Sequence, residues 1–215
     1  MRFTSLLTVA AAAVTSVRGV PTANTVESRD ISLSLNLGGL FNGFDLSSAN
    51  HYGAPSPPWV HGSKPGWYYG PHPGNHPTLP CLGGLICKIL DLIPFIIHCP
   101  HEYPNPPTYP PGNPPPSDGY TPTFNNITAA VQADDYMTFG LVETVVDCKA
   151  MCNSVDGCGF VNTYHDVNGK DGSPLLTCSL FKGCHGPEDA DNKGGQTQPD
   201  GSVDFIINSD GYCKQ

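Results

Sequence analysis

The 215 residues include 24 glycines and 23 prolines, which is too many for one compact globular domain. Nineteen of the 23 prolines lie between Pro55 and Pro122, so we expect a proline-rich region followed by a domain that begins near Tyr120. From Tyr120 onward, thirteen Asp and Glu stand against five Lys, which is nearly all of the chain's net charge of -9. Such a surface repels polyanions and argues against nucleic acid, heparin-like glycans and anionic membranes as partners.

The N-terminus is typical of a secretory signal peptide. Arg2 supplies a positive charge, residues 6–14 are apolar, and residues 17–19 fit a small-residue cleavage site. A transmembrane helix needs about 20 consecutive apolar residues, and polar residues interrupt this run too early. We therefore predict a signal peptide over residues 1–19 and a mature protein that is secreted, either extracellular or in the cell wall. The nine cysteines fit an oxidising compartment.

Residues 20–119 form a region rich in proline, glycine and histidine. From His51 to Pro80 these residues and aromatics dominate, so we expect no packed core there. Six of the eight histidines lie in the region, but no scaffold is expected to bring residues such as His72 and His76 into one metal site. Its aromatic side chains could contact polysaccharide or one another. Residues 100–122 predict a polyproline II spacer.

An apolar segment from Cys81 to Cys99 interrupts this region. Its aliphatic residues recur at helical spacing, which predicts a short helix that ends or kinks at Pro94. The helix would serve either as a self-association surface or as an element that docks on the C-terminal domain. The segment holds three cysteines, Cys81, Cys87 and Cys99. Because that number is odd, one thiol must stay free or pair between chains.

A capping box predicts a helix in the C-terminal domain. Thr144 suits the N-cap and Asp147 the N3 position, so the helix should run from about Val145 to Asn153. Cys148 and Cys152 then lie one turn apart on the same helix face. A third cysteine follows just beyond the helix end.

Strand signals follow this helix. Gly159–His165 alternates apolar and polar residues, and Leu175–Phe181 predicts a second strand with Cys178 in its middle. Between them, residues 166–173 contain Asn-Gly and Asp-Gly pairs that favour a hairpin turn. A further strand-like run spans Val203–Ile207.

These residues resemble the PAN/Apple module, in which a helix carries two cysteines and a third follows it. The Phe-x-x-x-Tyr strand at Phe160 and Tyr164 and the Cys-x-Leu strand at residues 178–180 match the same pattern. The resemblance covers residues 120–215 and implies an α+β fold, with one helix packed on an antiparallel sheet and stapled by disulfides. Spacing alone allows fifteen pairings of six cysteines. The pairs that the resemblance implies are Cys148–Cys178 and Cys152–Cys158, which leaves Cys184 with Cys213.

Two loops carry a second resemblance. Residues 165–174 and 194–201 are similar to secreted fungal proteins called fruit-body-specific proteins. That similarity implies a setting in the fungal cell wall or fruiting tissue and supplies no biochemical activity.

Motifs of catalysis are absent from the sequence. It contains no Gly-x-Ser-x-Gly elbow, no His-Glu-x-x-His zinc helix and no Gly-rich phosphate loop, so we predict a protein that is not an enzyme and has no cofactor. Asp166, Asn168 and Asp171 crowd one loop with oxygen atoms, but Lys170 occupies a ligand position of the EF-hand pattern. A hairpin turn explains the same residues, and we predict no metal site.

One N-glycosylation sequon begins at Asn126, which we expect to carry a glycan in a secreted chain. Two functions remain open. The first is a non-catalytic binding module whose partner is a glycan or an extracellular protein. The second is a structural cell-wall or fruiting-body matrix protein that self-associates through its N-terminal half, with disulfide links through Cys81, Cys87 or Cys99.

Overall fold

The computed structural model describes residues 46–63, 67–79, 92 and 118–215, all of which belong to the compact unit Ser34–Gln215. The predicted signal peptide, the spacer up to residue 117 and the cysteines of the Cys81–Cys99 segment lie outside the described residues. Within that segment only Leu92 is described, and its side chain is 83% exposed. Among the residues described, no helix has the length and apolar character needed to cross a bilayer.

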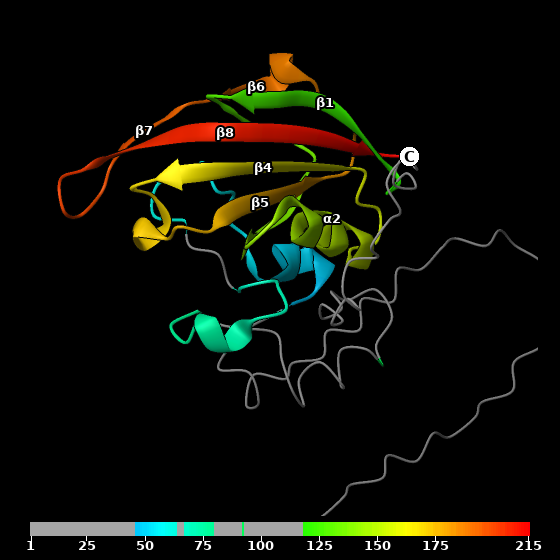
Figure 1. Cartoon of the computed structure of the whole chain (residues 1–215), viewed down its shortest axis with the longest axis horizontal. Coiled ribbons are helices and arrows are strands. Elements are labelled where there is room, and N and C mark those ends of the chain that lie inside the picture. The colour runs from blue at the N-terminus through cyan, green and yellow to red at the C-terminus, as the bar shows by residue number, and fades with distance from the viewer. Residues whose placement is uncertain (1–45, 64–66, 80–91, 93–117) are drawn as a thin grey trace, which may run out of the picture. The chain divides into compact units, whose positions relative to one another are not determined.

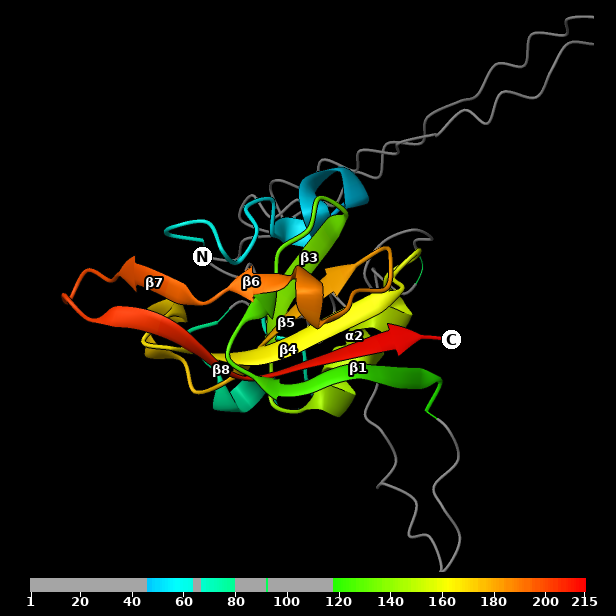
Figure 2. The ribbon, with the colours of Figure 1, turned by 90° about the horizontal axis from the view of Figure 1, so that it is seen from above.

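The fold is α+β, with one main helix packed on an antiparallel sheet, as predicted (Figure 1). The main sheet has the strand order β1-β8-β4-β5-β3, and β7 pairs with the first part of β8. Figure 2 shows that the β7–β8 hairpin extends beyond the rest of the sheet. The strands of this sheet are β1 (Tyr120–Ile127), β3 (Tyr136–Val142), β4 (Phe160–Val167), β5 (Leu176–Phe181), β7 (Gly194–Thr197) and β8 (Val203–Lys214).

The helix α2 (Val145–Ser154) begins where the capping box predicts. The Thr144 hydroxyl accepts a hydrogen bond from the Asp147 backbone N–H at 3.2 Å, and the Asp147 carboxylate accepts one from the Thr144 N–H at 3.0 Å. These reciprocal bonds satisfy backbone donors that the first turn leaves open. The predicted hairpin is also confirmed, because β4 and β5 pair antiparallel around the short 3₁₀ turn η3 (Lys170–Gly172).

The predicted bounds of two segments need correction. The run predicted at Val203–Ile207 continues as β8 to Lys214, although it contains residues that are poor strand formers. The last residues of the predicted polyproline spacer belong to β1, which begins at Tyr120. Pro122 is tolerated there because β1 is the edge strand of the sheet, where a missing N–H breaks no necessary pairing.

A second layer covers the face of the sheet opposite α2. It consists of β2 (Ala130–Val131) paired with β6 (Ala190–Asn192), and the 3₁₀ turn η4 (Pro187–Asp189) precedes β6. The Val131 N–H donates to Asn162 Oδ1 on β4 at 2.9 Å. Because side chains alternate along β4, Asn162 faces away from Val161, which packs in the cluster beneath α2.

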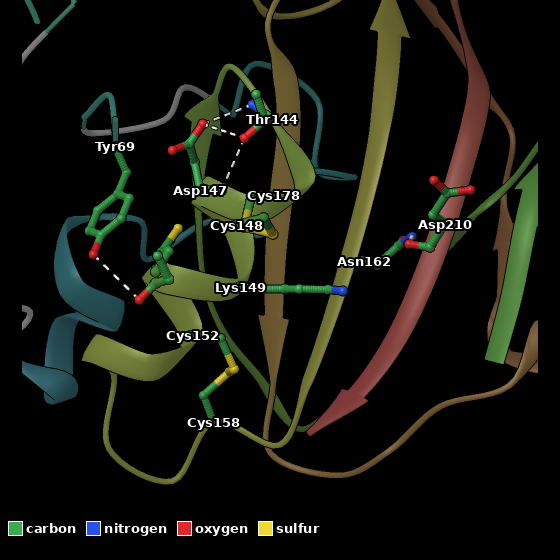
Figure 3. Close-up of a disulfide and its surroundings, with 12 residues drawn as sticks. Tyr69, Thr144, Asp147, Cys148, Lys149, Cys152, Cys158, Asn162, Cys178 and Asp210 are labelled. Carbon is green, nitrogen blue, oxygen red and sulfur yellow. Dashed lines mark hydrogen bonds between the residues drawn. A yellow bond between two sulfur atoms is a disulfide. The ribbon is translucent and has the colours of Figure 1, made fainter. Parts of the chain in front are cut away.

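Three disulfides staple the domain, and they are the pairs that the PAN/Apple resemblance implies. Cys148–Cys178 ties α2 to β5, Cys152–Cys158 closes the loop after α2, and Cys184–Cys213 ties the loop after β5 to the end of β8. Figure 3 shows the first two. Cys148 and Cys178 are 30 residues apart, so the chain-entropy model assigns their bond about 3 to 4 kcal/mol.

The region expected to lack packing also contributes to the core. We call residues 46–63 and 67–79 the strap. Its buried residues include the aromatic and aliphatic side chains of Tyr52, Ala54, Trp67, Tyr68 and Tyr69. The indole N–H of Trp67 donates to the Tyr52 carbonyl at 2.8 Å, and the Trp67 side chain is only 1% exposed. The prediction of no packed core was wrong for these residues. A segment too rich in proline and glycine to form its own core can still pack its aromatic rings against the core of a neighbouring domain.

The strap pairs with the edge strand β3 through a short parallel bridge between Tyr68 and Leu141. The Tyr69 N–H donates to the Leu141 carbonyl at 3.0 Å, and the Leu141 N–H donates to the Trp67 carbonyl at 3.5 Å. The Tyr69 hydroxyl donates to the Ala150 carbonyl on α2, as Figure 3 shows. The strap therefore covers an edge that would otherwise expose unpaired backbone groups.

Candidate binding site

A pocket of about 580 Å³ lies between the strap and the β4–β5 hairpin. Strap residues 75–79 form one wall, after the short turn η2 (Pro73–Asn75). The domain supplies the other wall, which consists of Leu141, Lys170, Asp171, Ser173 and Pro174. The volume is within the range of about 300 to 1,000 Å³ that is usual for sites of small ligands.

The pocket combines apolar and polar lining groups. Leu141 belongs to a buried cluster with Tyr68 and Leu175, and Leu79 packs against that cluster. The other lining residues include two prolines and six side chains with amide, imidazole, hydroxyl, ammonium or carboxylate groups. The lining is therefore more polar than that of most sites for small molecules, which are mainly apolar.

One carboxylate holds the strap wall in place. Glu143, just after β3, lies with Oε2 2.8 Å from His72 Nδ1 and with Oε1 3.2 Å from His76 Nε2. The Tyr68 hydroxyl donates to Glu143 Oε1 at 3.0 Å, and the Tyr68 ring contacts the His76 ring in a tilted arrangement, with centroids 4.4 Å apart and planes at 35°. We call this group the His72–Glu143–His76 clasp.

The clasp keeps Glu143 ionised. Partial burial opposes the charge of Glu143, but hydrogen bonds from His72, His76 and Tyr68 outweigh it and hold the pKa of this carboxyl below its ordinary value. Burial, together with the nearby Glu143 charge, raises the pKa of Tyr68, so its hydroxyl remains a donor at ordinary pH. In the clasp, the Glu143 carboxylate therefore accepts hydrogen bonds from three side chains.

A buried ion pair supports the opposite wall. Lys170 Nζ lies 3.3 Å from Asp166 Oδ2, and their side chains are 7% and 6% exposed. The same ammonium donates to the Pro58 carbonyl at 2.9 Å and to the Ser63 hydroxyl at 3.2 Å, so it also binds the strap. Burial raises the pKa of Asp166 above its ordinary value even though Lys170 acts in the opposite direction.

The backbone of this wall is held in an unusual conformation. Asn168, Lys170 and Asp171 have φ angles of 64°, 50° and 57°, in the left-handed region that non-glycine residues seldom adopt. Such a conformation persists where surrounding contacts fix it. Here the contacts of Lys170 with Asp166 and with the strap fix it, so the pocket wall is preorganised.

The residues weighed as calcium ligands do not converge on one point. Asp166 faces Lys170, while Asn168 Nδ2 donates to the Val203 carbonyl at 2.9 Å. In the part of the chain that the structure describes, no group of three or more His, Cys, Asp or Glu side chains is arranged to hold a metal ion. His72 and His76 do come together, but on a carboxylate that the sequence did not connect with them.

The sequon residue Asn126 lies on the exposed edge strand β1, far along the sheet from β3. Its Oδ1 accepts a hydrogen bond from Asn208 Nδ2 at 2.9 Å, and its backbone N–H donates to Asp210 at 2.7 Å. A glycan on this residue would therefore leave the pocket accessible. Glycosylation itself stays a prediction.

The pocket could not be predicted from the sequence, because residues 75–79, Leu141 and residues 170–174 meet only in the folded chain. The clasp had one weak signal, the His-x-x-x-His spacing of His72 and His76. The aromatic residues of this region were expected to contact polysaccharide or one another. Trp67, Tyr68 and Tyr69 are buried between the strap and the domain, and the rings of Trp67 and Tyr69 contact each other with centroids 5.5 Å apart. No family model matches the chain, and no curated protein or solved structure matches it either.

Proposed function

We propose that this chain is a secreted, non-catalytic binding protein that holds a neutral glycan in the pocket between the strap and the β4–β5 hairpin. The observation that carries the proposal is the pocket itself, whose volume is about 580 Å³ and whose lining mixes apolar and hydrogen-bonding groups. Neutral sugars present both hydroxyl groups and apolar C–H faces, and these match the two kinds of lining group. The contact of His76 with Glu143 holds one wall and that of Lys170 with Asp166 holds the other, which lowers the entropy lost on binding.

Charge supports a neutral ligand over an anionic one. Lys170 lines the pocket, but its ammonium is directed to Asp166 and to the strap. Asp171 adds a carboxylate to the same wall. Together with the acidic domain, this arrangement disfavours sulfated or phosphorylated ligands.

The support for a non-catalytic role is that polar groups around the pocket serve structural contacts. His76 contacts Glu143, and the Ser173 hydroxyl accepts a hydrogen bond from the Leu175 N–H at 3.3 Å. The latter bond is typical of a turn, not of an activated nucleophile.

A PAN/Apple-like identity is part of the proposal. Its support is the helix with two cysteines, the three disulfide pairs and the buried positions of Phe160 and Tyr164 on β4. The similarity of two loops to fruit-body-specific proteins supports a fungal extracellular setting. In that setting the abundant neutral ligands are wall glycans, and extracellular proteins are the competing partners.

The test is a combined array of glycans and extracellular proteins, probed with the full secreted chain. Ser173→Trp places a large ring on the pocket wall, and Thr121→Trp places the same ring on the exposed edge strand β1 as a matched control. We expect Ser173→Trp to weaken glycan binding at least tenfold and Thr121→Trp to leave it unchanged. Binding only to proteins, or equal binding by both variants, would contradict the proposal.

A further inference from the structure

We propose that the His72–Glu143–His76 clasp makes the pocket responsive to pH, so that the strap closes the pocket in mildly acidic solution and opens as the solution becomes neutral to basic. This inference deepens the proposed function, since it concerns regulation of the same pocket. Opening of the strap is nevertheless measurable without any ligand.

The clasp is placed where it controls one wall of the pocket. The Asn75 N–H donates to the His72 carbonyl at 2.9 Å and the His76 N–H to the Pro73 carbonyl at 3.1 Å, so the turn η2 brings both histidines to the same side. Each ring reaches a different oxygen of Glu143. His76 is itself a lining residue, and the lining residues 77–79 follow it directly. Releasing the histidines from Glu143 would therefore release the wall.

The domain holds its half of the clasp rigidly. Glu143 follows the last residue of β3 and precedes Thr144, the N-cap of α2. The strand pairing on one side and the capping box on the other fix the backbone of Glu143. The movable partner is therefore the strap.

The charged groups that face the two histidines are mainly acidic. Glu143 contacts both, and Asp147 lies close enough behind it to act on Tyr68. Across the pocket, Asp171 adds a negative charge, while Lys170 is directed to Asp166. Tyr68 remains a neutral donor to Glu143.

The direction of the pH effect follows from these charges. Imidazole side chains lose their proton between about pH 5 and 8, whereas the Glu143 carboxylate stays charged over that range. Charge-assisted hydrogen bonds are about twice as strong as neutral ones, so each contact weakens as its histidine becomes neutral. His72 is 58% exposed and His76 is 20% exposed, so solvent screens the pair and the effect is modest. We expect the opening constant of the strap to rise about threefold to tenfold from pH 5 to pH 8.

Hydrogen exchange of the full secreted chain measures this opening. Exchange of peptides from residues 67–79 is followed at pH 5, 6, 7 and 8, corrected for intrinsic exchange rates, at constant ionic strength and with EDTA to remove bridging metal ions. The Leu79 amide, which donates to the His76 carbonyl at 3.1 Å, reports the strap wall of the pocket. Peptides from β4 serve as an internal reference, and we expect their opening to be independent of pH over this range.

Matched variants assign the effect to the clasp. Glu143→Gln keeps the shape of the side chain and removes its charge, and the double change His72→Gln with His76→Gln removes both titrating rings. We expect the pH dependence to disappear in both variants and to persist in His61→Gln, which removes an exposed strap histidine outside the clasp. Equal pH dependence in the wild-type chain and in Glu143→Gln would overturn the inference, as would a pH-independent wild-type strap. Failure to bind any glycan would contradict the proposed function alone, because strap opening is measured without ligand.

Discussion

The indole ring of Trp67 lies against Gly140 in the middle of β3, and a Cβ atom on Gly140 would come within 3.3 Å of Trp67 Cζ3. The strap therefore packs on β3 at a glycine, which has no side chain to displace the indole ring. The same added atom would lie 3.4 Å from the Met151 methyl group on α2. Trp67 thus fills a site between the sheet and the helix.

Replacing Gly140 by valine should displace Trp67. The branched side chain needs more room than one methyl group, and overpacking of a core costs about 1 to 3 kcal/mol. We expect thermal unfolding of Gly140→Val at a lower temperature than that of the wild-type chain. Gly74→Val is the control, because a Cβ at Gly74 meets no atom within 4 Å. Equal melting temperatures for the two variants would contradict the packing described.

Truncating Trp67 tests whether the strap belongs to the cooperative core. Removal of a buried tryptophan side chain typically costs about 3 to 5 kcal/mol, so Trp67→Ala should lower the free energy of unfolding in urea by an amount of that order. Val60→Ala is the comparison within the strap, because Val60 is 43% exposed. If Trp67→Ala were as stable as Val60→Ala, the strap would be an accessory segment and not part of the core.

Charge removal at Glu143 should change stability in a pH-dependent way. Its folded-state pKa is lowered, so the stability that it contributes is present above its unfolded pKa and is lost as pH falls through the folded value. The contacts that Glu143 makes with imidazoles are charge-assisted only while the ring carries its proton, and imidazoles in general lose that proton between about pH 5 and 8. The stability difference between the wild-type chain and Glu143→Gln should therefore be largest near pH 5 to 6. Because Glu143 is partly exposed, we expect a difference of less than about 1 kcal/mol. Urea unfolding at pH 3, 5.5 and 8 measures it, and a difference that grows steadily toward pH 8 would contradict the assignment.

Self-association remains the alternative function, and the odd number of cysteines in the Cys81–Cys99 segment motivates its test. If Cys81, Cys87 or Cys99 links chains, non-reducing electrophoresis of the secreted protein should show a band of twice the monomer mass that disappears on reduction. Replacing all three by serine should abolish this band and leave the three disulfides of the domain intact. A monomeric band without reductant would count against covalent self-association.

Local signals in the sequence predicted local structure well. The capping box of Thr144 and Asp147 identified α2, because the N-cap bonds involve residues three apart. The turn pairs between β4 and β5 identified the hairpin for the same reason. Both features depend on neighbours in the chain.

Other than the disulfide pairs, which a resemblance implied, features formed by distant residues could not be predicted. β3 is buried along its whole length and so shows no alternation of apolar and polar residues. β8 has a left-handed residue at Asn208, with φ of 52°, which interrupts its strand pattern. Composition suggested that the strap was unstructured, because composition reports whether a segment can form its own core and not whether it can dock on another. The pocket and the clasp depend on that docking.

The two anchored ends of the proline-rich segment have a further consequence. Leu79 packs against the cluster that contains Leu141, and Asp118 lies 2.7 Å from Lys149 on α2, so the residues just before and just after residues 80–117 both contact the domain. One peptide bond cut between residues 100 and 117 would separate the molecule into two polypeptides without removing a single described contact, because the cysteines of the domain pair with one another. The strap would then be a non-covalent subunit, joined to the domain by the pairing of Tyr68 with Leu141 and by the burial of Trp67.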